Sequence, residues 1–278
     1  MSLSRFSLRT IGTPERTQIT YSPERGALIT SLRIHRRELL YLDEATFQDP
    51  SVNVRGGIPL LFPNAGPIDD PRFPGFLRTR SDWSAREDAD GRGFSLSCAA
   101  TDDTRAVYPY AFLFTFRVRI EADDSVTLVQ SVTNQESEQA LPISMGLHPY
   151  FSVPHAQKSA LRFACTEGSA IEQAVEDWAN GGTVSMTNPS VLDPSATVCV
   201  TIRTMGTLSL QASADYRRFW VWSLPGKDFL CLEPVMRDVG GLANDPYLVH
   251  PHETYTAHVQ IRFFPDSRET CCLLVNEA

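Results

Sequence analysis

The chain has 278 residues, of which 42% are hydrophobic, and its formal net charge at pH 7 is −8. An acidic chain in which no run of Lys or Arg exceeds two residues is not expected to bind nucleic acid or an anionic membrane surface. No apolar run approaches the ~20 residues that a membrane span needs, and the first segment, MSLSRFSLRT, lacks the apolar core of a secretory signal, so a cytoplasmic protein is expected.

Apolar residues recur with a period of two along most of the chain, which is typical of β-strands with one buried face. In chain order, strands are predicted at Gln18–Ser22, Ala27–His35, Gly93–Ala100, Ala160–Cys165, Thr197–Arg203, Thr207–Ser213, Phe219–Ser223, Phe229–Glu233, Tyr255–Phe264 and Cys272–Val275. The segment REDADGRGF predicts a hairpin turn centred on Asp90–Gly91.

The clearest single element is a hairpin that begins near Ala111. A polar turn is expected at Asp123–Asp124, and apolar residues alternate with polar ones on both sides of it. The residues predicted to share the buried face are Phe112, Phe114, Phe116, Val118 and Ile120 before the turn, and Val126, Leu128 and Val132 after it.

Helical spacing is rare and is found mainly in Ser169–Asn180, where a serine could cap the first turn. The 19 prolines are spread along the chain, so no linker divides it. Many short strands with regular turn signals predict an all-β sandwich or barrel, and ~250 residues is within the range of one all-β domain. We therefore expect residues 1–278 to form a single all-β domain.

The six cysteines lie mostly in apolar, strand-like segments and form no C-x-x-C pair. Buried free thiols in a reducing compartment are the expectation from this pattern.

Four segments interrupt the strand pattern by placing polar residues in apolar company. In NVRGGIPLLFPNAGP, Arg55 precedes paired glycines that allow the backbone to approach a ligand closely. In FPGFLRTRSDW, Arg78 follows an apolar triplet. The other two segments are SMGLHPYF, which contains His148, and DFLCLEPVMRDVGGLAND, which contains Glu233. The alternative for the first is a strand bulge with a solvated arginine.

His148 and Glu233 occur in the same local context, since each closes a predicted strand and each is followed by proline. A glutamate at the end of a buried strand is partly desolvated, which raises its pKa toward that of a useful base. An imidazole opposite it would serve as the partner acid. The alternative is that His148 belongs to an ordinary turn, where Gly146 relaxes the backbone and Pro149 stops the strand.

A metal site is the weaker hypothesis. His250, His252 and His258 lie near Glu253, and His-x-His on a strand would place two imidazoles on one face. However, Pro251 indicates a turn here, and no further ligand set follows, so no metal is expected. The chain also lacks G-x-S-x-G, Walker and dinucleotide-binding motifs.

Taken together, RGGIPLLFP, GFLR with a following Trp, GLHPYF and CLEPV resemble, in order and approximate spacing, the aldose 1-epimerases (mutarotases) and the related hexose-6-phosphate epimerases. The resemblance extends from Gly26 to Phe264 and implies a large two-sheet antiparallel β-sandwich of the galactose mutarotase type. It implies that His148 is the general acid and Glu233 the general base. It also implies that Arg55 and Arg78 line a sugar or sugar-phosphate pocket.

Asp193 corresponds, on loose spacing only, to a family aspartate that contacts sugar hydroxyls. The family usually has His-Gly ahead of the second arginine, whereas this chain has Pro74–Gly75, which leaves the identity of the sugar open. The arginines alternatively pair with Asp69, Asp70 or Asp82.

The implied reaction is the interconversion of α and β anomers of a hexose or hexose phosphate, which needs no cofactor. Two other functions stay open. The first is a non-catalytic carbohydrate-binding or sensing protein on the same fold, which would not need a matched acid and base. The second is a glycoside hydrolase or lyase-like sandwich, which would need two carboxylates across the sugar, and only Glu233 stands in a motif here.

Overall fold

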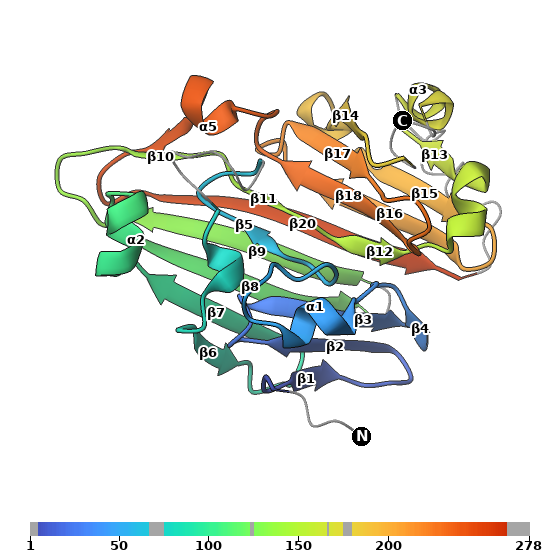
Figure 1. Ribbon diagram of the computed structural model, residues 1–278, viewed down its shortest axis with the longest axis horizontal. Coiled ribbons are helices and arrows are strands. Elements are labelled where there is room, and N and C mark those ends of the chain that lie inside the picture. The colour runs from blue at the N-terminus through green and yellow to red at the C-terminus, as the bar shows by residue number, and fades with distance from the viewer. Residues whose placement is uncertain (1–4, 67–74, 123–124, 166, 175–179, 266–278) are drawn as a thin grey trace.

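Antiparallel β-sheets make up most of the computed structural model, which describes residues 5–66, 75–122, 125–165, 167–174 and 180–265 (Figure 1). The largest sheet has eight strands in the order β13 (Arg162–Ala164), β15 (Val198–Ile202), β16 (Gly206–Ala212), β20 (Thr254–Phe264), β9 (Ser125–Asn134), β8 (Phe112–Ala122), β7 (Gly93–Ala99) and β6 (Ser84–Glu87).

A six-stranded sheet forms the second layer. Its order is β14 (Thr183–Thr187), β17 (Arg218–Trp222), β18 (Phe229–Val235), β11 (Gly146–Leu147) and β5 (Leu60–Leu61), and β12 (Tyr150–Ser152) also pairs with β18. One smaller sheet contains β1 (Arg9–Gly12), β2 (Thr17–Ser22), β3 (Leu28–Ile34) and β4 (Arg37–Glu38), and another pairs β10 (Leu141–Ile143) with β19 (Tyr247–Val249). The expected all-β antiparallel fold is confirmed, and the described residues form two large sheets and two smaller ones.

The main hydrophobic core lies between the two large sheets. The alternation predicted for the hairpin at residues 111–134 is confirmed, because β8 and β9 pair antiparallel and the odd and even positions of β8 differ in burial. Phe114 and Phe116 of β8 are fully buried and belong to the same core cluster as Leu230 and Leu232 of β18. One face of β18 therefore packs on the core and leaves the other face for a site.

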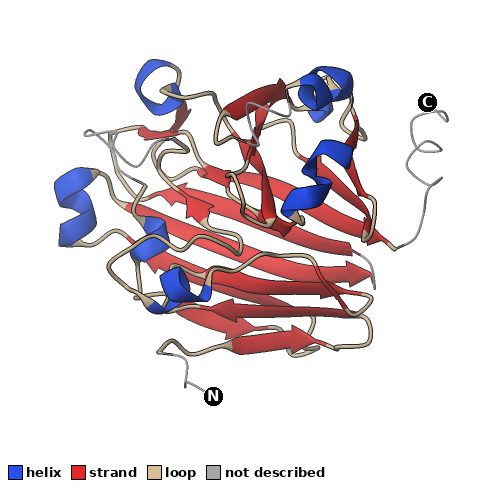
Figure 2. Cartoon of the chain, turned by 45° about the vertical axis from the view of Figure 1, so that its right-hand side comes forward, coloured by secondary structure: helices blue, strands red, loops and turns tan. Residues whose placement is uncertain are grey.

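The helices in the described part of the chain are short (Figure 2). They are α1 (Glu44–Gln48), α2 (Asp102–Val107), α3 (Gly168–Gln173), α5 (Gly241–Asn244) and the 3₁₀ helices η1 (Leu77–Thr79), η2 (His155–Ala160) and η3 (Pro189–Val191). Within the described ranges, no helix is both long and apolar enough to span a bilayer. The helix expected at Ser169–Asn180 is present in part as α3, and residues 175–179 lie outside the described residues.

The four-stranded sheet is joined to the six-stranded layer by an isolated bridge between Ile29 of β3 and Ile58, two residues before β5. The segment between β4 and β5 carries α1, and Asp43 caps that helix by accepting a hydrogen bond from the Thr46 amide at 3.1 Å. This arrangement places Arg55 next to the six-stranded sheet. The predicted strand Cys272–Val275 and the turn Asp123–Asp124 lie outside the described residues.

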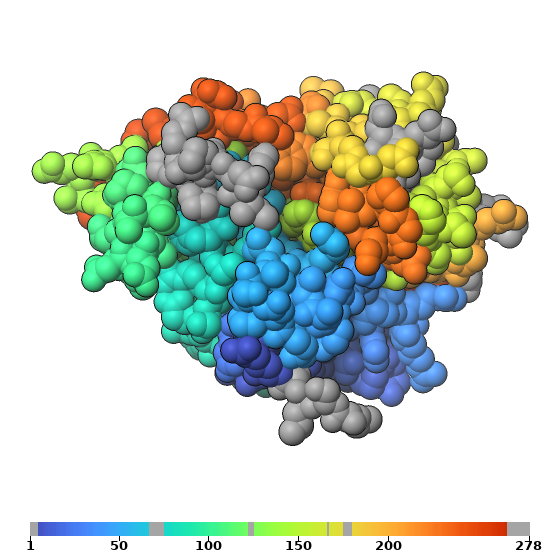
Figure 3. Space-filling model, viewed as in Figure 1, coloured from blue at the N-terminus to red at the C-terminus, as the bar shows by residue number. Residues whose placement is uncertain are grey.

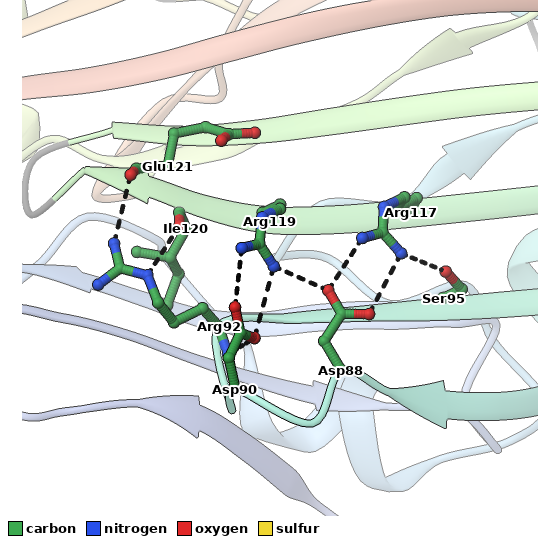
Figure 4. Close-up of polar contacts among 8 residues, drawn as sticks. All are labelled: Asp88, Asp90, Arg92, Ser95, Arg117, Arg119, Ile120 and Glu121. Atoms are coloured by element: carbon green, nitrogen blue, oxygen red, sulfur yellow. Dashed lines mark hydrogen bonds and ion pairs between the residues drawn. The ribbon is translucent and has the colours of Figure 1, made fainter.

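Charged side chains hold the predicted hairpin turn at Asp90–Gly91 against the outward-facing side of β8 (Figure 4). Asp88 accepts hydrogen bonds from Arg117 and Arg119, each at 2.9 Å, and Arg119 also donates to Asp90 at 2.8 Å. Gly91 has a φ of +66°, which glycine adopts without strain. The turn is therefore fixed by local chemistry on the face opposite the core.

The cysteine expectation is correct in part. Cys98, Cys165 and Cys231 carry free thiols, whereas Cys199 is disulfide-bonded. The expectation of reduced cysteines is wrong for Cys199, and this removes part of the ground for expecting a reducing compartment.

Candidate active site

The pocket that contains the predicted catalytic residues opens on the outer face of the six-stranded sheet, and its volume is about 380 Å³. Arg55, Arg78, His148 and Glu233 all line it. In the space-filling view the surface is hollowed between the blue segment that precedes β5 and the orange segment that contains β17 and β18 (Figure 3). The structure thus brings together four residues that lie far apart in the sequence.

Strand β18 forms the floor of the pocket. Leu230 and Leu232 point into the main core, so the alternation of the strand turns Cys231 and Glu233 to the opposite face. Across the sheet, Glu233 is paired with Trp220 of β17. The carboxyl group is therefore enclosed by the sheet, and only 5% of the Glu233 side chain is exposed.

His148 is held between β5 and β12, directly after β11. Its amide donates to the Pro59 carbonyl at 3.0 Å, and its ring stacks on Tyr150 with centroids 4.6 Å apart and planes at 8°. Trp222 meets the same ring edge-on, with centroids 5.8 Å apart. These contacts fix the imidazole in position and orientation.

At Gly146, two residues before His148, there is no room for a side chain. A Cβ at this position would lie 2.8 Å from Val235 Cγ1 and 2.9 Å from the Pro234 carbonyl, so a larger residue would push β11 away from β18. From the core side, the fully buried Gln130 donates to the Gly146 carbonyl at 3.1 Å and accepts a hydrogen bond from Tyr216 at 2.5 Å. These buried hydrogen bonds connect β11, which directly precedes His148, to β9 of the other sheet.

The imidazole and the carboxyl group face each other, with His148 Nε2 3.5 Å from Glu233 Oε1. Burial raises the pKa of Glu233 to about 8, against a smaller lowering effect of the Arg78 guanidinium. Burial, with a further contribution from Arg78, lowers the pKa of His148 to about 3. Near neutrality the pair therefore holds one proton and no net charge.

Arg78 lies in η1, and its guanidinium reaches the pocket. Burial lowers its pKa, while Tyr150 and Glu233 act in the opposite direction. Its Nε has no hydrogen-bond partner, and Asp82 pairs with Arg80 instead. Over the described ranges, neither Arg55 nor Arg78 forms an ion pair. Asp69, Asp70 and Pro74 lie outside those ranges.

Aromatic residues of the pocket were missed by the sequence analysis. Trp220 and Trp222 of β17 line it together with Tyr150. Hydrogen bonds fix the orientation of both indoles. Trp220 Nε1 donates to Asp238 at 3.0 Å, and Trp222 Nε1 donates to the Gly181 carbonyl at 3.1 Å. The signal was the spacing of two tryptophans at i and i+2 in RFWVWS, which puts both on one face of a strand.

Asp193 does not lie with the other predicted residues. It is exposed after η3, where its carboxylate accepts from the Ser195 amide at 2.9 Å and from the Ser195 hydroxyl at 2.7 Å. It does not line the pocket that contains His148. Asp193, which was suggested on loose spacing only, therefore stabilises a local turn outside this pocket.

The residues that could hold a metal ion are not the histidines considered in the sequence analysis. Among the described residues, the cluster close enough to do so is His148, Cys231 and Glu233, whose ligand atoms lie within 4.8 Å of one another. His250 and His252 do not belong to it.

The sequence and the fold of this chain are similar to those of known proteins. A model of the family described as "Aldose 1-epimerase" matches residues 8–262. A protein of Escherichia coli (strain K12), named as a candidate glucose-6-phosphate 1-epimerase, is 28% identical over 121 residues. This match covers 42% of the chain and only 38% of the relative's length.

Solved structures share the fold at low identity. The Slr1438 protein from Synechocystis sp. PCC 6803 has a TM-score of 0.82 at 23% identity, with coverage of 96% of this chain and 98% of that one. A galactose mutarotase related enzyme from Lactobacillus acidophilus has a TM-score of 0.71 at 16% identity, with 95% and 99% covered. Galactose 1-epimerase from Lactobacillus acidophilus NCFM has a TM-score of 0.69 at 9% identity, with 94% and 100% covered. The galactose mutarotase type of fold is thereby confirmed.

The buried carboxyl group predicts a pH-dependent cost to stability. Because the pKa of Glu233 is raised to about 8 in the folded protein, the folded state keeps a proton that the unfolded chain releases above about pH 4.3. The free energy of unfolding contributed by this group therefore falls as pH rises through that window. Glu233→Gln should remove the effect, so the difference in unfolding free energy, variant minus wild type, should grow by up to about 1.4 kcal/mol per pH unit between pH 5 and 8.

Urea unfolding of both proteins at several pH values measures this slope. Glu15→Gln, which changes an exposed glutamate, is the matched control and should show no such slope. Parallel curves for Glu233→Gln and wild type would mean that Glu233 is ionised at neutral pH in the folded protein.

Proposed function

Because this chain belongs to the aldose 1-epimerase family, we propose that it interconverts the α and β anomers of a hexose, free or phosphorylated, by acid–base catalysis through ring opening. The observation that carries the proposal is the pairing of His148 with Glu233, 3.5 Å apart in a pocket of about 380 Å³. A ligand pocket of this size suits a single sugar ring.

The reaction requires two proton movements. A base takes the proton from the C1 hydroxyl while an acid protonates the ring oxygen, the C1–O5 bond breaks, and an open-chain aldehyde forms. Rotation about C1–C2 presents the other carbonyl face, and closure reverses both proton transfers. One carboxyl group and one imidazole are sufficient, and each positioned acid or base typically contributes ~10²–10⁴-fold.

A pair that holds one proton matches this requirement. The order of the two pKa values favours the proton on Glu233, whereas the family resemblance implies a carboxylate base and an imidazolium acid. Both forms contain the same number of protons and differ only by a transfer over 3.5 Å. The Arg78 guanidinium favours the carboxylate of Glu233 but disfavours the imidazolium of His148, so it does not select between the two forms by itself. A sugar hydroxyl that donates to Glu233 would favour the carboxylate, so substrate binding would set the reactive arrangement.

The walls of the pocket supply contacts suited to a sugar. Tyr150, Trp220 and Trp222 present aromatic surface to the apolar C–H face of a pyranose. Asn53 Oδ1 and Arg78 Nε are buried without hydrogen-bond partners and can accept from and donate to hydroxyl groups.

We further propose that the hexose carries a phosphate group. Arg55 lines the pocket and has no ion pair among the described residues, so a phosphate would supply its missing counter-charge. The name of the Escherichia coli relative points to the same class of substrate. We therefore place Arg55 against the phosphate and the His148–Glu233 pair against C1 and O5.

Glu233→Gln and His148→Asn should each slow anomer exchange by at least ~10²-fold, because the amide group that replaces the carboxyl or the imidazole can act neither as an acid nor as a base near neutral pH. Exchange NMR on glucose, galactose and glucose 6-phosphate measures the rate, and titration of the same sugars measures binding. The controls are Glu15→Gln and His258→Asn, which change exposed residues away from the pocket. Full activity in either site variant would remove that residue from the mechanism. Sugar binding without exchange in the wild type would establish the alternative, a carbohydrate-binding protein.

Arg55→Ala should reduce kcat/KM for glucose 6-phosphate by ~10-fold or more, and for glucose much less, because only the phosphate gains a charge-assisted hydrogen bond from this residue. Arg55→Lys keeps the charge and should recover part of the loss. Equal losses on the two sugars would show that Arg55 contacts the ring rather than a phosphate.

A further inference from the structure

Cys231 lies beneath the pocket in a position that the proposed mechanism does not use. Its thiol is free and fully buried, and it belongs to the face of β18 that also carries Glu233. In the sheet register it pairs with Trp222 on one side and with Tyr150 on the other. Burial raises the pKa of the thiol, with a smaller contribution from Glu233, so the group is not a nucleophile by itself.

The atoms next to this thiol could act as ligands of a metal ion. Cys231 Sγ, a nitrogen of His148 and a carboxylate oxygen of Glu233 lie within 4.8 Å of one another. His148 Nδ1 is buried and has no hydrogen-bond partner. Three different donors thus converge at one point, and two of them line the open pocket.

The donor set selects the kind of ion. Thiolate and imidazole favour zinc and similar soft or borderline ions over Mg²⁺ and Ca²⁺, which prefer oxygen ligands. Zinc bonds of ~2.0–2.3 Å in a tetrahedral site separate the ligand atoms by roughly 3.3–3.8 Å. The present separations of up to 4.8 Å therefore need a contraction of about 1 Å. The fourth coordination position would face the pocket.

The charges of the three ligand groups also favour Zn²⁺. A thiolate and a carboxylate together balance the two positive charges of Zn²⁺, and the bound ion would displace the thiol proton and the proton shared by the His148–Glu233 pair. The remaining positive charge is that of Arg78, which already lies beside Glu233. Aromatic side chains on both sides of Cys231 exclude water and strengthen the attraction between ion and ligands.

We propose that Zn²⁺ binds to Cys231, Glu233 and His148 and inhibits the enzyme reversibly, because the ion occupies the lone pairs that move protons in catalysis. The binding site stands on the geometry alone, whereas the inhibition rests on the proposed function. Metal sensitivity would then be a property of the residue two positions before the catalytic glutamate.

Metal binding is tested first without any sugar. EDTA-treated wild type should take up one Co²⁺, give the near-ultraviolet absorption of a cobalt–thiolate bond, and lose it when Zn²⁺ is added. Cys231→Ala should abolish the band and weaken Zn²⁺ binding by at least about 100-fold. Cys98→Ala removes another buried free thiol, outside the cluster, and should behave as wild type. Cys231→Ser is the second variant if alanine prevents folding.

The inference is overturned if the wild type shows no thiolate band and no Zn²⁺ binding up to millimolar concentration, or if Cys231→Ala binds the ion as tightly as the wild type. With an active sugar, Zn²⁺ should stop exchange by the wild type and EDTA should restore it, whereas any exchange by Cys231→Ala should be insensitive. Zn²⁺ binding without loss of exchange would overturn the inhibition alone. Failure of every sugar to exchange would remove the proposed function but leave the metal result standing.

Discussion

Two ionisable groups, the buried Glu233 and the largely buried His148, meet at the floor of one pocket, and the rest of the site is arranged around that constraint. A buried carboxylate next to a buried imidazolium is costly, so each group favours its neutral form. With Glu233 protonated and His148 neutral, the pair retains one proton that can move over 3.5 Å. The charge of Arg78 lowers the pKa of both groups, so it favours the carboxylate of Glu233 and the neutral imidazole of His148. The result is a pair that holds a single proton on the Glu233 carboxyl group, from which the proposed anomer exchange would start.

The fold provides this constraint by means of a strand with two different faces. β18 packs Leu232 on the core and exposes Glu233 to the pocket. Gly146 allows β11 to approach β18 closely, and the buried Gln130 fixes that strand from the opposite sheet. Burying an amide in a hydrophobic core is tolerated because its hydrogen bonds are satisfied. The imidazole is thereby held by backbone and aromatic contacts, with no need for a carboxylate partner other than Glu233.

Much of this could be predicted from sequence because local patterns report burial directly. The alternation around Phe114 and Phe116 gave the hairpin, and the strand-ending motifs gave His148 and Glu233. What could not be predicted depends on pairing between distant strands. The position of Trp222 beside His148 follows from sheet register. Asp193 was placed by spacing alone, and its neighbour Ser195 satisfies it locally.

The pH dependence of kcat/KM tests the shared proton most directly, because this parameter reports the free enzyme's acid and base. We predict a level profile between pH 5 and 7 and a fall of about tenfold per pH unit above about pH 8, where Glu233 loses the proton. A fall that begins near pH 6.5 would mean that His148 titrates as an ordinary imidazole. A rate that still rises through pH 8 would mean that only an ionised Glu233 is active, and either result would contradict a pair that holds one proton.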